Sequence, residues 1–158
     1  MRFCSIILVL LLLTNCSGQK ETYHPDKVEK EVTQMLHDYH GAMSEGGLMA
    51  EFDFLDSSEN FFWVPPGYHS ALDFDSVKTI LMMNAPVMES MTLKWENLTV
   101  IPLSKNSANF HGIVHSLSRD TAGMVYDVRM IESGTAIRRG EGWRLLSGQT
   151  SMLPSENN

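Results

Sequence analysis

Cysteine is nearly absent from this chain, whose 158 residues contain only Cys4 and Cys16, both close to the N-terminus. Two cysteines at one end of a chain make neither a disulfide framework nor a zinc site. Basic runs are also missing, because the longest is Arg138-Arg139, and 12 Lys and Arg stand against 19 Asp and Glu for a net charge of −7. Nucleic-acid binding needs clustered positive charge, so it is excluded as a function.

Motifs that bind phosphate or activate a nucleophile are missing too. The glycines at 46–47 and 140–142 do not lead a strand into a helix with a following Lys, as a phosphate loop requires. None of the serines, Ser147 and Ser151 included, lies in a glycine-flanked nucleophile elbow. The sequence therefore predicts neither a phosphate loop nor a serine nucleophile.

The histidines do not form a metal-binding pattern. His111 and His115 are four residues apart on a predicted strand, which separates them by about 13 Å, too far to share a metal ion. His37 and His40 lie three residues apart on a predicted helix, and we expect both to face solvent. Since no third ligand has suitable spacing, we predict no metal site and no cofactor.

Long hydrophobic runs are limited to one, Ile6 to Leu13, after Arg2. A bilayer core requires roughly 20 apolar residues, so the run is typical of a secretory signal rather than a membrane span. It ends in Leu13-Thr14-Asn15-Cys16-Ser17, which resembles the lipobox of bacterial lipoproteins, although Asn15 departs from the small residue usual there.

This resemblance implies a signal peptide at 1–15, cleavage before Cys16, acylation of its thiol, and a short tether over 16–24. The implied location is the cell envelope, with the domain anchored by lipid and facing the periplasm or the outside. The alternative is an ordinary signal peptide with a coincidental cysteine.

After this leader the chain reads first as helices. Residues 25–44 carry six apolar side chains on one face of a helix, namely Val28, Val32, Met35, Leu36, Tyr39 and Met43. Gly46-Gly47 ends this helix, and residues 48–55 predict a short second one. A short strand at 61–64 is followed by a third helix that Asp73 or Asp75 caps and that runs to about Asn84.

From residue 91 onward the pattern is typical of long strands, over 91–103, 107–117, 124–138 and 142–151. The connections between them are short and turn-like, which favours a sequential antiparallel meander. Helices followed by such a sheet predict one α+β domain over 25–153, with a tail at 154–158.

The last two strands carry a family resemblance. Thr135 to Ser151, with the step Gly142-Trp143-Arg144, is similar to the end of the nuclear transport factor 2-like superfamily, in particular its SnoaL-like and ketosteroid-isomerase-like bacterial members. Phe62-Trp63 and the segment 108–112 also resemble segments of this family, but less closely. The resemblance implies a cone-like, curved antiparallel sheet wrapped around the N-terminal helices, with a pocket at its open end. This fold hosts isomerases, cyclases, dehydratases, binding modules and dimerisation domains.

Strand alternation indicates which residues face such a pocket. It groups Phe110 with the even-numbered residues of its strand, and Tyr126 with Met130 on the next. We predict a small, largely apolar ligand contacted by Trp63, Tyr68, Phe110, Tyr126 and Met130. The alternative for each of these residues is a place in the core.

The resemblance also implies an acid or a His–Asp pair as catalyst, with a Tyr as donor. The candidate bases are His69 and Asp127, with His115 and Asp53 as further candidates, and the donor is Tyr126 or Tyr68. No motif fixes any of these roles, so ligand binding is the preferred hypothesis and an isomerase, cyclase or dehydratase the alternative. A second alternative is a partner-binding domain, and a homodimer through the outer face of the sheet is compatible with the mixed polarity of residues 109–115.

Overall fold

The computed structural model describes residues 22–154. The predicted signal peptide, Cys16 and most of the tail lie outside this range. Within it, no helix is long and apolar enough to cross a membrane. The described chain has the predicted α+β fold, in which helices come first and a curved sheet follows.

The helical part contains two α-helices and two short 3-10 segments. The first helix, α1, spans Pro25–Gly46 and buries the predicted apolar face. The predicted second helix is the 3-10 segment η1, Leu48–Phe54. The third, α2, spans Phe74–Asn84, and a 3-10 turn η2, Ala85–Val87, connects it to the sheet.

Asp73 caps α2, as predicted, because its Oδ1 accepts a hydrogen bond of 2.8 Å from the backbone N–H of Ser76. We expect Asp73→Ala to lower the free energy of unfolding by about 1 kcal/mol, the usual cost of losing such a cap. Chemical denaturation measures this loss. The control is Asp75→Ala, which removes an acid from the same first turn but no capping bond. An equal effect of the two substitutions would contradict a specific role for the cap.

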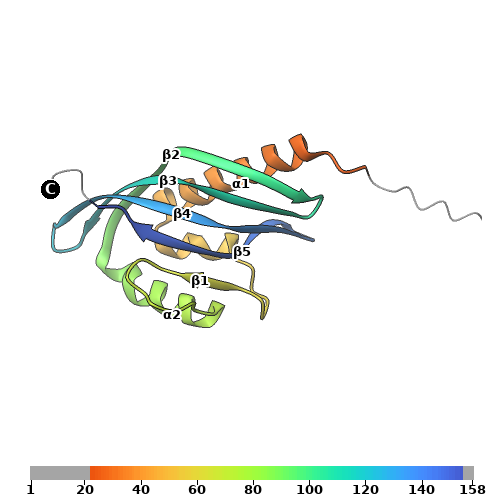
Figure 1. Cartoon of the computed structure of the whole chain (residues 1–158). Helices are drawn as coiled ribbons and strands as arrows, with labels where there is room; N and C mark the ends of the chain where they lie inside the picture. The colour runs from red at the N-terminus through yellow and green to blue at the C-terminus, as the bar shows by residue number, and fades with distance from the viewer. Residues whose placement is uncertain (1–21, 155–158) are drawn as a thin grey trace, which may run out of the picture.

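The sheet has five strands in the order β1-β5-β4-β3-β2. The strands are β1 Phe62–Val64, β2 Met88–Ser104, β3 Ser107–Asp120, β4 Val125–Arg139 and β5 Gly142–Met152. The four long strands form the predicted antiparallel meander, and β1 adds a short parallel edge beside β5. Figure 1 shows α1 alongside β2 and β3, with β1 and α2 beyond the opposite side of the meander.

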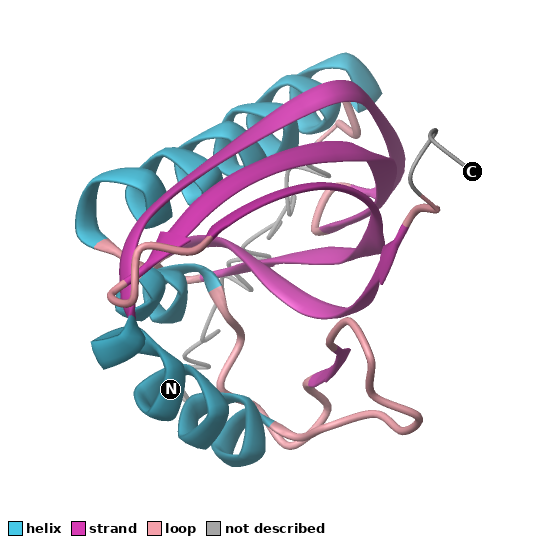
Figure 2. Cartoon of the chain, turned by 90° about the vertical axis from the view of Figure 1, so that its left-hand side faces the viewer, coloured by secondary structure: helices cyan, strands magenta, loops and turns pink. Residues whose placement is uncertain are grey.

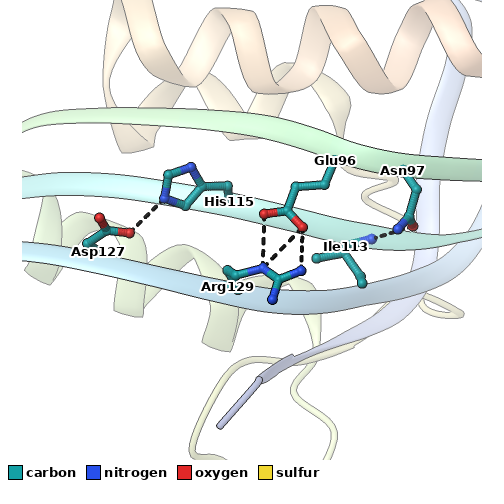
Figure 3. A network of polar contacts seen from close by, with 6 residues as sticks. All are labelled: Glu96, Asn97, Ile113, His115, Asp127 and Arg129. Atoms are coloured by element: carbon teal, nitrogen blue, oxygen red, sulfur yellow. Dashed lines mark hydrogen bonds and ion pairs between the residues drawn. The ribbon is translucent and has the colours of Figure 1, made fainter. Parts of the chain in front are cut away.

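The long strands bend strongly along their length (Figure 2). In β2 the register shifts between Trp95, which pairs with Val114, and Asn97, which pairs with Ile113. A Cβ at Gly112 would lie 2.3 Å from the carbonyl oxygen of Asn97, so only glycine fits this close approach. The Asn97 side chain accepts a hydrogen bond of 3.0 Å from the backbone N–H of Ile113 (Figure 3), which satisfies a group at the bulge.

The hydrophobic core lies between α1 and the inner face of the sheet. Its fully buried side chains come from both layers: Val32 and Leu36 of α1, Phe110 and Val114 of β3, and Leu145 of β5. The core fills one end of the cone, and the other end holds the cavity described next.

Candidate functional site

A cavity of about 720 Å³ opens between the helices and the inner face of the sheet. Residues of α1, η1, α2 and all five strands contribute to its wall. Most of them are apolar, and five are methionines: Met43, Met88, Met91, Met130 and Met152. Methionine fits apolar ligands of varied shape because its side chain is flexible and polarizable.

A buried group of polar side chains interrupts this apolar wall beside α1. The Tyr39 hydroxyl donates a hydrogen bond of 3.2 Å to Oε1 of Glu51. Close by in sequence, the imidazole Nε2 of His40 lies 3.5 Å from Oε2 of Glu132. All four residues are buried, and Tyr39, Glu51 and Glu132 line the cavity. We call these four residues the acidic cluster.

Each member of the acidic cluster is placed by its own element. Tyr39 and His40 lie on the buried face of α1. Glu51 belongs to η1, which folds back against α1 after the turn at Gly47. Gly47 has φ of 75°, a conformation that glycine adopts at little cost. Glu132 faces inward because it continues the even-numbered alternation of β4.

Burial changes the acid–base properties of this cluster. Burial and the negative charge of Glu132 raise the pKa of Glu51 from 4.5 to about 7, although the Tyr39 hydroxyl opposes the rise. Burial and the charges of Glu51 and Glu132 likewise raise the pKa of Tyr39 well above its usual value. Glu51 can therefore both accept and release a proton near neutral pH.

Three buried polar atoms of the cluster have no hydrogen-bond partner in the described chain: Nδ1 and Nε2 of His40 and Oε1 of Glu132. The imidazole of His40 stacks on the Trp95 ring, with 4.7 Å between ring centroids, and so lies behind the cavity wall. Buried polar atoms are normally hydrogen-bonded, so unpaired ones call for an explanation.

Other polar groups lie along the β-sheet wall. The Trp63 indole donates a hydrogen bond of 3.2 Å to Oγ1 of Thr150, and both line the cavity. At the exposed rim the Tyr126 hydroxyl donates to Oδ2 of Asp120 at 3.0 Å. The backbone N–H of Met124 also donates to Asp120 and, as the main cause, lowers the pKa of its carboxyl.

The predicted ligand residues fall into two groups. Trp63, Tyr126 and Met130 line the cavity. Phe110 faces inward but is part of the packed core, edge-on to Trp95. Tyr68 is exposed in the turn after β1, while the two prolines of that turn, at 65 and 66, line the cavity instead.

The predicted catalytic bases lie away from the cavity, whereas Tyr126, the predicted donor, lines it. Asp127 and His115 form a pair 2.6 Å apart, exposed on the outer face of the sheet beside the Arg129–Glu96 ion pair (Figure 3). Both carry odd numbers on strands whose even-numbered residues face inward, which explains their position. His69 and Asp53 are exposed and are not among the residues that line the cavity.

Sequence reasoning missed the acidic cluster. The prediction that His40 faces solvent is wrong, because His40 is only 2% exposed. Its position four residues after Leu36 and three before Met43, on the apolar face, was a usable signal. Glu132 continues the alternation that correctly placed Met130 inward. Glu51 carries no such signal, because it lies in a short 3-10 segment.

The acidic cluster does not resemble a metal centre. Across residues 22–154, no three His, Cys, Asp or Glu side chains are grouped so that they could hold a metal ion.

Comparison with known proteins finds solved structures that share the fold of this chain. No protein-family model and no curated protein sequence matches the chain. An NTF2-like superfamily protein from Salmonella enterica superposes with a TM-score of 0.68 at 16% identity, covering 84% of this chain and 95% of that one.

Two further solved structures superpose on this chain to a similar extent. A ketosteroid isomerase-like protein from Erwinia carotovora gives a TM-score of 0.66 at 14% identity, over 82% of this chain and 98% of that one. A candidate dehydratase from the NTF2-like family of Streptomyces avermitilis gives 0.70 at 16% identity, over 84% and 100%. The chain therefore has the cone-like α+β fold of the NTF2-like superfamily.

Proposed function

We propose that this domain binds a small, largely apolar molecule in its cone cavity. The observation that carries the proposal is the cavity of about 720 Å³, with an apolar wall broken by the acidic cluster. Small-molecule sites are commonly cavities of roughly 300–1,000 Å³, with apolar walls and a few polar groups that orient the ligand.

The arrangement of polar groups supports an oriented ligand. The Oε1 of Glu132 has no partner, and Glu51 has a single hydroxyl donor in Tyr39. A ligand with a polar end would supply the missing donor there, while its apolar body lies against the methionines.

A cavity-filling substitution tests this function. Val128 of β4 lines the cavity, so Val128→Trp should fill part of it. The variant should no longer bind N-phenyl-1-naphthylamine, an uncharged apolar probe whose fluorescence rises in apolar surroundings. The control is Val125→Trp, on the same strand but 51% exposed, which should bind the probe as the wild type does. Equal binding by both variants would contradict the proposal.

A second candidate function is acid–base catalysis of an isomerase, cyclase or dehydratase type. The observation that favours it is Glu51, whose pKa of about 7 suits a general base at neutral pH. The roles first considered for His69 and Asp127 pass to Glu51 here, because Glu51 lines the cavity. Wild-type protein should speed exchange of the α-hydrogens of 1-tetralone in D₂O, followed by NMR, and Glu51→Gln should not. Exchange no faster than in buffer would exclude this chemistry for that ketone.

We further propose that the domain is a lipoprotein held at a membrane of the cell envelope through Cys16. The support is the apolar run before Cys16 and the lipobox-like residues at 13–17. Two or three acyl chains on one cysteine would anchor the domain stably. Cys16→Ser should move the protein to the soluble fraction of the cell and change its gel mobility. Unchanged partitioning and mobility would contradict lipidation.

A homodimer through the outer face of the sheet stays a prediction. Phe62, Ile101 and Ile131 are exposed, and the sheet also carries the exposed polar pairs of Figure 3, a mixture compatible with an interface. Light scattering of the purified domain measures its mass in solution.

A further inference from the structure

The charged residues of the cavity are all acidic. Among residues 22–154, those that line it are Glu51, Asp120 and Glu132, and no Lys or Arg of this range joins them. Asp120 is occupied by the turn after β3, where its side chain accepts hydrogen bonds from Ala122, Met124 and Tyr126. Glu51 and Glu132 therefore remain as the two acids available to a ligand.

The two glutamates are incompletely neutralised by the protein. The imidazole of His40 lies 3.5 Å from Oε2 of Glu132, whereas Oε1 of Glu132 has no hydrogen-bond partner among residues 22–154 and the residue is 4% exposed. Glu51 receives only the neutral hydroxyl of Tyr39. A carboxylate oxygen buried without a donor is costly, so a donor entering from the cavity would be strongly favoured.

The charge of the cluster selects among donors. A carboxylate or phosphate on the ligand would be repelled by both glutamates, whereas a hydroxyl would satisfy one oxygen without offsetting their mutual repulsion. An ammonium group supplies up to three N–H donors and a full positive charge. The apolar wall would at the same time accommodate a hydrocarbon body, and it includes the aromatic residues Trp63 and Tyr39.

We infer that the ligand of this cavity is an apolar amine, whose protonated nitrogen pairs with Glu51 and Glu132. The inference rests on the proposed binding function and names the chemical class of its ligand. It also implies that binding depends on pH, because a cation is held best when Glu51 is ionised.

Few titratable groups of the described residues lie near Glu51. They are Tyr39 of α1 and Glu132 of β4, with His40 behind Glu132. The lining residues contributed by α2 and β5 carry no titratable side chain. Because the pKa of Glu51 is about 7, its ionised fraction rises between pH 6 and pH 8, and affinity for a cation should rise with it.

Three compounds with the same ring system test this inference by calorimetry: 1-naphthylmethylamine, 1-naphthalenemethanol and 1-naphthoic acid. At pH 8 the amine should bind about tenfold more tightly than the alcohol, the advantage of a charge-assisted hydrogen bond, and the acid most weakly. The advantage of the amine should shrink several-fold at pH 6, because binding of the uncharged alcohol should change much less than binding of the amine.

Glu51→Gln should remove most of the amine's advantage over the alcohol. The control is Glu141→Gln, which makes the same change in net charge at a side chain that is 90% exposed. If Glu51→Gln does not fold, the pH dependence of the wild type still decides the matter. Equal affinity for amine and alcohol would overturn the inference but leave the proposed function intact, whereas no binding of any compound would overturn both.

Discussion

His40→Ala is expected to lower the free energy of unfolding by about 2 to 4 kcal/mol, because it removes a buried ring and takes a polar neighbour from a buried glutamate. The loss has two sources. Glu132, 4% exposed, would lose the imidazole that lies 3.5 Å from its Oε2. The Trp95 ring would also lose its stacking contact with the imidazole, whose centroid lies 4.7 Å from its own.

A double-mutant cycle measured by chemical denaturation separates these sources. In the Glu132→Gln background the same His40 substitution should cost clearly less, because no charge is then left unpaired. The control is His37→Ala, an exposed position of the same helix, which should change stability by less than about 0.5 kcal/mol. A cost at His40 that is independent of Glu132 would show that packing alone explains it.

Glu51→Gln is expected to stabilise the domain at pH 8 by about 3 kcal/mol and to have little effect at pH 5. The ordinary pKa of a glutamate carboxyl, 4.5, applies to Glu51 in the unfolded chain, and this pKa rises to about 7 in the folded domain. Between these values the folded state holds a proton that the unfolded state has lost, so stability falls as pH rises through this window. Each unit of pKa shift lowers the free energy of unfolding at high pH by about 1.36 kcal/mol. Glutamine does not ionise, so the Glu51→Gln variant does not lose this stability.

Thermal unfolding at the two pH values measures this effect. At pH 8 the variant should melt roughly 10 °C above the wild type, given the size of the domain, and at pH 5 the two should nearly coincide. The Tyr39 hydrogen bond is retained in this comparison, because the amide oxygen of glutamine accepts it as the carboxylate does. A constant difference between variant and wild type across pH would contradict a raised pKa at Glu51.

Local patterns were sufficient to predict most of the fold. The apolar spacing of α1, the cap at Asp73 and the short turns between the long strands each act within a few residues, and the structure has all of them. The parallel pairing of β1 with β5 joins Trp63 to Gly148, far apart in sequence, and no local pattern marks it.

The site was harder to predict for a related reason. Catalytic candidates were chosen by residue type, which led to His115 and Asp127. The two do form a close pair, but on the outer face. Strict use of strand alternation would have excluded them and pointed to Glu132. Glu51 depends on how η1 packs against α1, a tertiary contact that sequence periodicity does not report.

The methyl groups of the methionines test the central claim, ligand binding in the cone cavity, most directly. Five methionines line the cavity, and Met152 among them is also 62% exposed at its rim. Met49, Met82, Met83 and Met124 are exposed and are not among the lining residues. In an NMR titration of methyl-¹³C-methionine-labelled protein with 1-naphthylmethylamine, the signals of Met43, Met88, Met91, Met130 and Met152 should shift together and saturate, and the exposed four should stay in place. Shifts confined to the exposed methionines, or no shifts at saturating concentration, would contradict a binding site in the cavity.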